Sequence, residues 1–70
     1  MEQSHLMTIE EAATFLNLKV SKLRRDVFMK SIPYYKFGSL IRFKKEELLK
    51  WIDEKFVNPE TVLNLKLHNI

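Results

Sequence analysis

Pro33 and Gly38 constrain the fold most, because each dictates the backbone around it. Pro33 lacks an amide hydrogen and disfavours a helical conformation at Ile32, so any helix must end before it. Gly38 is the only glycine in the chain. It lies between two short runs rich in β-branched and aromatic residues, 34–37 and 40–43. Glycine adopts the positive φ of a tight turn, so a β-hairpin is predicted here.

A first helix is predicted over residues 8–16. Thr8 and Glu11 have the spacing of a capping box, in which each side chain accepts a hydrogen bond from the other residue's backbone. Apolar residues follow at helical intervals. Asn17 tolerates the left-handed conformation and is expected to end the helix.

A second helix follows almost at once, with Leu23 and Val27 on its inner face. Only residues 17–19 separate the two helices, which is typical of a helix-turn-helix. Lys19 stands where a serine or threonine cap is usual. Either Ser21 caps the second helix instead, or the cap is lost.

A third helix is predicted over residues 44–56, with Leu48, Ile52 and Phe56 as its apolar stripe. The Asn-Pro pair that follows either ends this helix or starts a short fourth one within the apolar segment 58–70.

The order of elements predicts one domain of mainly α structure with a small β-hairpin, a winged helix-turn-helix. Its expected limits are residues 7–57, with an N-terminal tail over 1–6 and a C-terminal tail, helical or not, over 58–70. The chain has no cysteine, so a disulfide framework is excluded and the 70 residues must form their own core.

Positive charge is concentrated in the middle of the chain. Residues 19–45 carry nine Lys or Arg against one Asp, a net +8, whereas residues 1–18 carry −3 and residues 46–70 carry −2. A solvated surface normally mixes signs, so this block favours an anionic partner. Nucleic acid is the first interpretation, and a membrane surface or simple solubility are the alternatives.

Several functional classes are not expected. No apolar run approaches the roughly 18 residues of a membrane span, and no secretory signal is visible, so a cytoplasmic protein is predicted. His5 and His68 are isolated and lack cysteine partners, which argues against a metal site. Without a cysteine nucleophile or a glycine-rich phosphate loop, we expect neither an enzyme nor a bound cofactor or small-molecule ligand.

The ordered set of motifs resembles the excisionase-type, MerR-like DNA-binding domain of phages and mobile elements. The resemblance covers about residues 7–55 and rests on the following segments: 7–13, Leu16-Asn17-Leu18, Leu23, Arg25, Ile32-Pro33, Lys36-Phe37-Gly38, Arg42-Phe43, Glu47-Leu48 and Trp51-Ile52. It implies that the second helix enters the major groove and that the hairpin, the wing, contacts the backbone or minor groove. Asp26 departs from the pattern, because an apolar residue is expected there.

Candidate DNA contacts in the second helix are Lys19, Ser21, Lys22, Arg24 and Arg25. Arginine can bind a guanine edge or a phosphate through two parallel hydrogen bonds, and Lys19 suits a phosphate at the helix N-terminus. The alternatives are a surface arginine paired with an acidic neighbour, Asp26 or Glu10, and a capping role for Ser21.

Candidate contacts in the wing are Lys36, Ser39 and Arg42, which are expected to face outward. The inward face is expected to be drawn from Phe37, Ile41 and Phe43, because side chains alternate along a strand. Three further aromatics, Phe28, Tyr34 and Tyr35, are expected to close the core rather than to stack on single-stranded nucleic acid.

The resemblance implies an excisionase, or recombination directionality factor, which binds and bends double-stranded DNA beside an attachment site and acts with an integrase. Copies of such a protein often bind side by side, so cooperative self-association on DNA is expected. A small transcriptional regulator of the same fold is the near alternative. A protein-interaction adaptor that docks an integrase or another partner is the alternative from another class.

Overall fold

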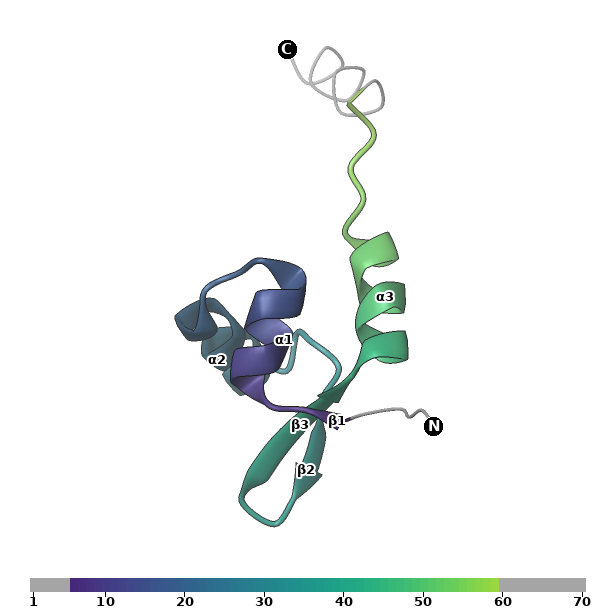
Figure 1. Ribbon diagram of the computed structural model, residues 1–70. Coiled ribbons are helices and arrows are strands. Elements are labelled where there is room, and N and C mark those ends of the chain that lie inside the picture. The colour runs from purple at the N-terminus through teal and green to yellow at the C-terminus, as the bar shows by residue number, and fades with distance from the viewer. Residues whose placement is uncertain (1–5, 60–70) are drawn as a thin grey trace.

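The computed structural model describes residues 6–59 and contains, within them, three helices and a small antiparallel sheet (Figure 1). The elements in chain order are β1 (Leu6–Met7), α1 (Ile9–Leu16), α2 (Val20–Phe28), β2 (Tyr35–Phe37), β3 (Leu40–Lys44) and α3 (Lys45–Glu54). The predicted helix-turn-helix, hairpin and third helix are therefore all present. None of the helices in this part of the chain has the length and hydropathy needed to cross a membrane.

The start and end of α1 follow the predicted local signals. The Thr8 amide donates to Glu11 Oε1 at 2.9 Å, and the Glu11 amide donates to Thr8 Oγ1 at 3.1 Å, which completes the capping box. Asn17 has φ of 58° and donates its amide back to the last turn. Satisfied amides at one end and a left-handed residue at the other confine the helix to eight residues.

The second helix begins without a side-chain cap. Lys19 is its N-cap residue and makes no capping hydrogen bond, and Ser21 lies inside the helix, so the cap is lost rather than transferred. The helix ends at Phe28, before Pro33 is reached, because Lys30 adopts a left-handed conformation with φ of 57°. The Ser31 amide then donates to the Asp26 carbonyl at 2.8 Å and closes the last turn.

The sheet has the strand order β1-β3-β2, with all neighbours antiparallel. Gly38 has φ of 63° in the turn between β2 and β3, as predicted. The third strand, β1, is not predicted from the sequence, from which a two-stranded hairpin is expected and Leu6 falls in the N-terminal tail. Leu6 pairs with Lys44 and Met7 with Phe43. Two residues are too few to show an alternating pattern, so only the pairing defines this strand.

The core lies between α1, α2, β3 and α3. Its buried apolar residues are Ala12, Ala13, Leu23, Ile32, Phe43 and Leu48. The predicted inner face of α3 is partly wrong: Leu48 is fully buried, but Ile52 is exposed and Phe56 follows the end of the helix with 74% of its surface exposed. Half-buried Trp51 takes the place expected for Ile52.

Two further expectations concern the aromatic residues and the C-terminal tail. Tyr34 packs against the core and Tyr35 is half-buried, but Phe28 is 84% exposed, so the prediction that it closes the core is wrong. Of the predicted tail over 58–70, residues 60–70 lie outside the described residues.

Candidate nucleic-acid interface

The outward side of α2 presents Ser21, Arg24 and Arg25 together. These residues are spaced by three and four positions, which places them on one side of a helix. All three are exposed, while Leu23 between them is fully buried against the core. The burial of Leu23 therefore fixes the rotation of α2 and points both arginines away from the protein.

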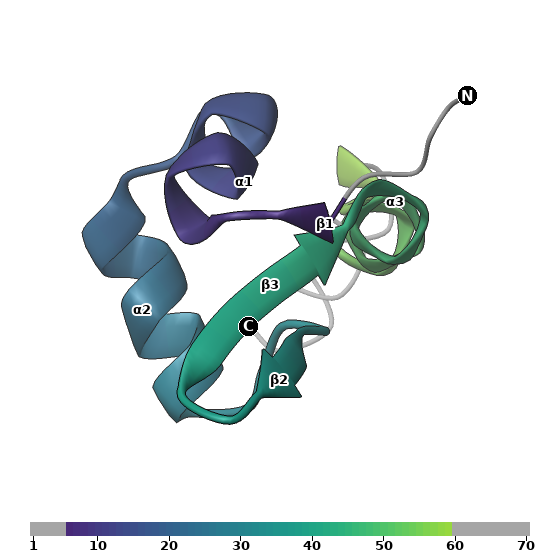
Figure 2. The ribbon, with the colours of Figure 1, turned by 60° about the horizontal axis from the view of Figure 1, so that its bottom comes forward.

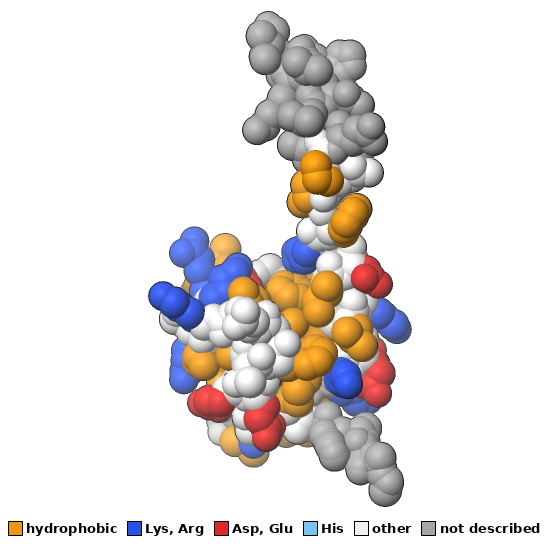
Figure 3. Space-filling view, turned by 45° about the horizontal axis from the view of Figure 1, so that its top comes forward, with side chains coloured by type: hydrophobic (Ala, Val, Ile, Leu, Met, Phe, Trp, Pro, Cys, Tyr) orange, Lys and Arg blue, Asp and Glu red, His pale blue; other side chains and the backbone are white. Residues whose placement is uncertain are grey.

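Neither arginine has a charged or hydrogen-bonded side-chain partner among residues 6–59. The alternative in which they pair with Asp26 or Glu10 is not observed: Asp26 is buried and its Oδ1 accepts from Lys22 and Ser31, while its Oδ2 has no hydrogen-bond partner among the described residues. Two exposed arginines without an ion-pair partner in the described part of the chain therefore lie on this side of α2. Figure 3 shows several Lys and Arg side chains on the left, where α2 lies, and others on the right, where acidic side chains lie among them.

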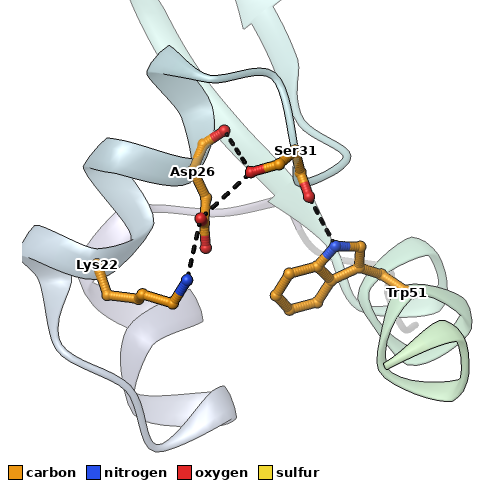
Figure 4. Close-up of polar contacts among 4 residues, drawn as sticks. All are labelled: Lys22, Asp26, Ser31 and Trp51. Carbon is orange, nitrogen blue, oxygen red and sulfur yellow. Dashed lines mark hydrogen bonds and ion pairs between the residues drawn. The ribbon is translucent and has the colours of Figure 1, made fainter. Parts of the chain in front are cut away.

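Asp26 faces the interior of the molecule, where an apolar residue is expected. Its polar side chain is accommodated there because it has hydrogen-bond partners. It is 7% exposed and accepts from Lys22 Nζ at 3.1 Å and from Ser31 Oγ at 3.2 Å (Figure 4). Ser31 accepts in turn, through its backbone carbonyl, from Trp51 Nε1 at 2.8 Å. This network joins α2 to α3, because Trp51 lies on the third helix.

The network makes Lys22 less available for a contact with DNA. Its ammonium group is part of an ion pair with Asp26, and the lysine side chain remains 54% exposed. The pair cancels one positive charge close to the arginines. Lys22 is therefore less available to a phosphate than Arg24 or Arg25, although both are predicted contacts of the same helix.

A groove separates α2 from the hairpin formed by β2 and β3, and three predicted contacts meet there. It has a volume of about 610 Å³, and its walls include Arg24 from α2, Ser39 from the turn and Arg42 from β3. Figure 2 shows the C-terminal end of α2 next to the turn end of β3, from which the two elements diverge. Arg42 Nη1 donates to the Ile41 carbonyl at 2.8 Å, which holds the guanidinium against the strand. Glu10 also lines the groove and lowers its positive potential at one end.

The remaining predicted contacts, Lys19 and Lys36, do not line the groove. Lys19 is exposed at the N-terminus of α2, where the helix dipole also favours an anion. Lys36 is exposed on the hairpin and pairs in register with Ile41, whereas Arg42 pairs with Tyr35. Directly paired residues share a face of the sheet. Lys36 and Arg42 therefore lie on opposite faces, although both are predicted to point outward.

Other lysines of the basic block are held against aromatic rings. Lys44 Nζ lies 5.2 Å from the centroid of the Tyr35 ring, and Lys45 Nζ lies 5.7 Å from that of Phe15. These distances fall within the range of cation–π contacts. Neither lysine lines the groove, so the density of positive charge in the sequence overstates the charge at the groove.

The apolar part of this surface is not among the contacts predicted from the sequence. Val27, Leu40 and Ile41 line the groove, and Phe28 is exposed beside the arginines. A signal for Phe28 was available, because it lies three positions after Arg25 and four after Arg24. Over residues 6–59 no cluster of His, Asp or Glu side chains is arranged to hold a metal ion.

A family model described as a helix-turn-helix domain matches residues 6–55. The chain belongs to this excisionase-like helix-turn-helix family. The match begins at Leu6 and ends one residue after α3, so it contains all six elements. The family binds DNA and is not catalytic. A search of curated proteins and a search of solved structures each found no match.

Membership of the helix-turn-helix family gives DNA as the partner and leaves the contacting residues to be assigned. The exposed side of α2 and the neighbouring groove are the parts of the described structure where unpaired arginines and a concave surface coincide.

Proposed function

We propose that this helix-turn-helix protein is an excisionase, or recombination directionality factor. It binds double-stranded DNA beside an attachment site of a phage or mobile element, bends that DNA, and directs a partner integrase toward excision. The observation that carries the proposal is the pair of unpaired arginines on α2 next to a groove that the hairpin also lines. The resemblance to excisionase-type domains supports the role in recombination.

The arrangement supports contacts with DNA from two elements, α2 and the hairpin. In helix-turn-helix proteins the second helix lies in the major groove. With Ser21, Arg24 and Arg25 facing the bases, the hairpin would lie along the neighbouring backbone, with Arg42 and Ser39 at its inner edge. Contacts on both sides of one phosphate strand favour a curved duplex, because bending brings more of the backbone against the protein.

The experiment is a gel-shift titration against duplexes tiled from the DNA that flanks the gene, followed by a mobility assay in which the bound site is moved along a fixed-length fragment. We expect discrete binding beside an integrase gene or attachment site, and a mobility that depends on the position of the site. Such a dependence is the signature of a bend. Excision by the integrase in vitro should then require the protein.

The outcomes separate this function from its alternatives. Binding confined to a promoter, without an effect on excision, would assign the protein as a transcriptional regulator. Weak binding everywhere that disappears with salt, together with retained binding to an integrase, would assign it as an adaptor. Arg25→Ala should weaken discrete binding in this assay, and Lys50→Ala is its matched control, because Lys50 is an exposed lysine on α3, outside the proposed interface.

A further inference from the structure

Phe28 is an unexplained feature of the interface. It is 84% exposed, the largest value among the exposed large apolar side chains of residues 6–59. The neighbouring Met29 is 60% exposed. An aromatic ring left in water at the end of a rigid helix makes no contribution to the core of so small a domain. Its position therefore suggests a contact with a partner.

The helical spacing places Phe28 on the DNA side of α2. Ser21, Arg24, Arg25 and Phe28 follow the pattern i, i+3, i+4 and i+7, which defines a single face. Leu23 lies on the opposite face and is fully buried. A partner that covers the two arginines would therefore also meet the phenylalanine ring.

The charges around Phe28 indicate which kind of partner contacts it. A second copy of this chain docked face to face would bring the arginines of both copies together, and like charges across an interface oppose association. Duplex DNA is anionic, and its major groove also contains one exposed apolar group on the four standard bases, the methyl group at C5 of thymine.

The distances along the helix agree with this partner. Seven residues at 1.5 Å per residue place Phe28 roughly 10 Å along α2 from Ser21. That length corresponds to about three base-pair steps of roughly 3.4 Å. The ring would lie within the groove at the opposite end of the contact from Ser21, with the arginines between them.

We propose that Phe28 is a specificity-determining residue that recognises a thymine through its C5-methyl group, about three base pairs from the base nearest Ser21. The proposal rests on the proposed function, because it requires α2 to lie in the major groove. It adds the class of base pair, T·A, that the C-terminal end of α2 selects.

The test uses the full chain and a duplex selected from a pool of random 20-base-pair duplexes. Each thymine of the selected duplex is replaced in turn by deoxyuridine, which lacks only the methyl group. We expect the replacement to weaken wild-type binding about fourfold at one position, or at two adjacent ones, because the contact with one buried methyl group is lost. The Phe28→Ala variant should bind thymine and deoxyuridine equally at that position.

Phe56→Ala is the matched control, because Phe56 has a similar exposure but lies after the end of α3. This variant should keep the wild-type preference for thymine. Circular dichroism should show that both variants are folded, since neither ring is buried. A single 5-methylcytosine placed at the critical position should bind wild type better than cytosine does, and should give no gain with Phe28→Ala.

Two results would overturn the proposal without touching the proposed function: discrete binding with no dependence on any thymine methyl, or a dependence that Phe28→Ala retains. A Phe28→Ala variant that binds DNA normally but loses self-association in solution would assign the ring to a second copy, and would equally overturn it. Absence of any selected duplex, with Arg25→Ala indistinguishable from wild type, would overturn the proposed function together with this inference.

Discussion

α2 and α3 are helices of similar length, 9 and 10 residues, that distribute their charges in opposite ways. On α3 acidic and basic residues are mixed on the exposed side, as on an ordinary solvated helix. On α2 the single carboxylate, Asp26, is turned inward and paired with Lys22, so no acidic residue of α2 lies on the surface with Arg24 and Arg25. The separation of charge across one helix, rather than the total charge of the chain, distinguishes the helix that we propose faces DNA.

The buried sides of the two helices are alike, and this gives the largest expected effect. Leu23 on α2 and Leu48 on α3 are both fully buried in one core. Leu23→Ala and Leu48→Ala should each lower the free energy of unfolding by about 2–5 kcal/mol, measured by urea denaturation. A loss below about 1 kcal/mol in either variant would show that its helix is not an integral part of the core.

The exposed sides should differ in DNA binding. Arg25→Ala should weaken binding to the selected duplex by about 1–3 kcal/mol if Arg25 contacts a base, without a change in stability. Lys50→Ala, the exposed control on α3, should leave the affinity unchanged. Equal losses in the two variants would remove the distinction between the helices. A loss of the same size on every DNA sequence would reassign Arg25 as a phosphate contact.

The inward carboxylate gives the smallest expected effect. Asp26→Asn keeps an oxygen for Ser31 but removes the ion pair with Lys22, and should lower stability by no more than about 1 kcal/mol, because the lysine is half exposed. It should also make Lys22 available to a phosphate. The slope of log K against log salt should then steepen by about 0.9.

The wild-type slope sets the baseline for that comparison. Three cations are expected to face phosphates: Lys19, Lys36 and Arg42. At roughly 0.9 per phosphate, these give a slope near −2.7. If Asp26→Asn changes neither the salt slope nor the stability, the inward pairing of Asp26 does not control the charge of α2.

Local signals account for the parts of the fold that the sequence predicts. The Thr8–Glu11 capping box, the left-handed Asn17 and the turn at Gly38 are each specified within a few residues. The spacing of Leu23 and Val27 likewise predicts the inner face of α2. These features bound α1, the short connection to α2, and the hairpin.

Features that depend on contacts between distant segments were not predictable. The two residues of β1 form a strand only because β3 offers an open edge. The rotation of α3 is set by the packing of Leu48 and by the hydrogen bond from Trp51 to Ser31, so Ile52 is exposed despite its helical spacing.

The same limit applies to the candidate interface. The eight predicted contacts include Arg24, Ser39 and Arg42, which the structure brings to one groove. The pairing of Lys22 with Asp26 and the opposite faces of Lys36 and Arg42 depend on side-chain packing and strand register. Composition counts these charges equally and cannot distinguish a paired lysine from an unpaired arginine.

The most direct test of the central claim is an NMR titration of the labelled full chain with the selected duplex, followed through its backbone amides. The account predicts that the largest shifts fall in residues 19–28 of α2 and in residues 39–42 of the hairpin, while residues 45–54 of α3 change little. Shifts that are largest on α3, or that spread evenly over the surface, would contradict the assignment of α2 as the DNA-facing helix.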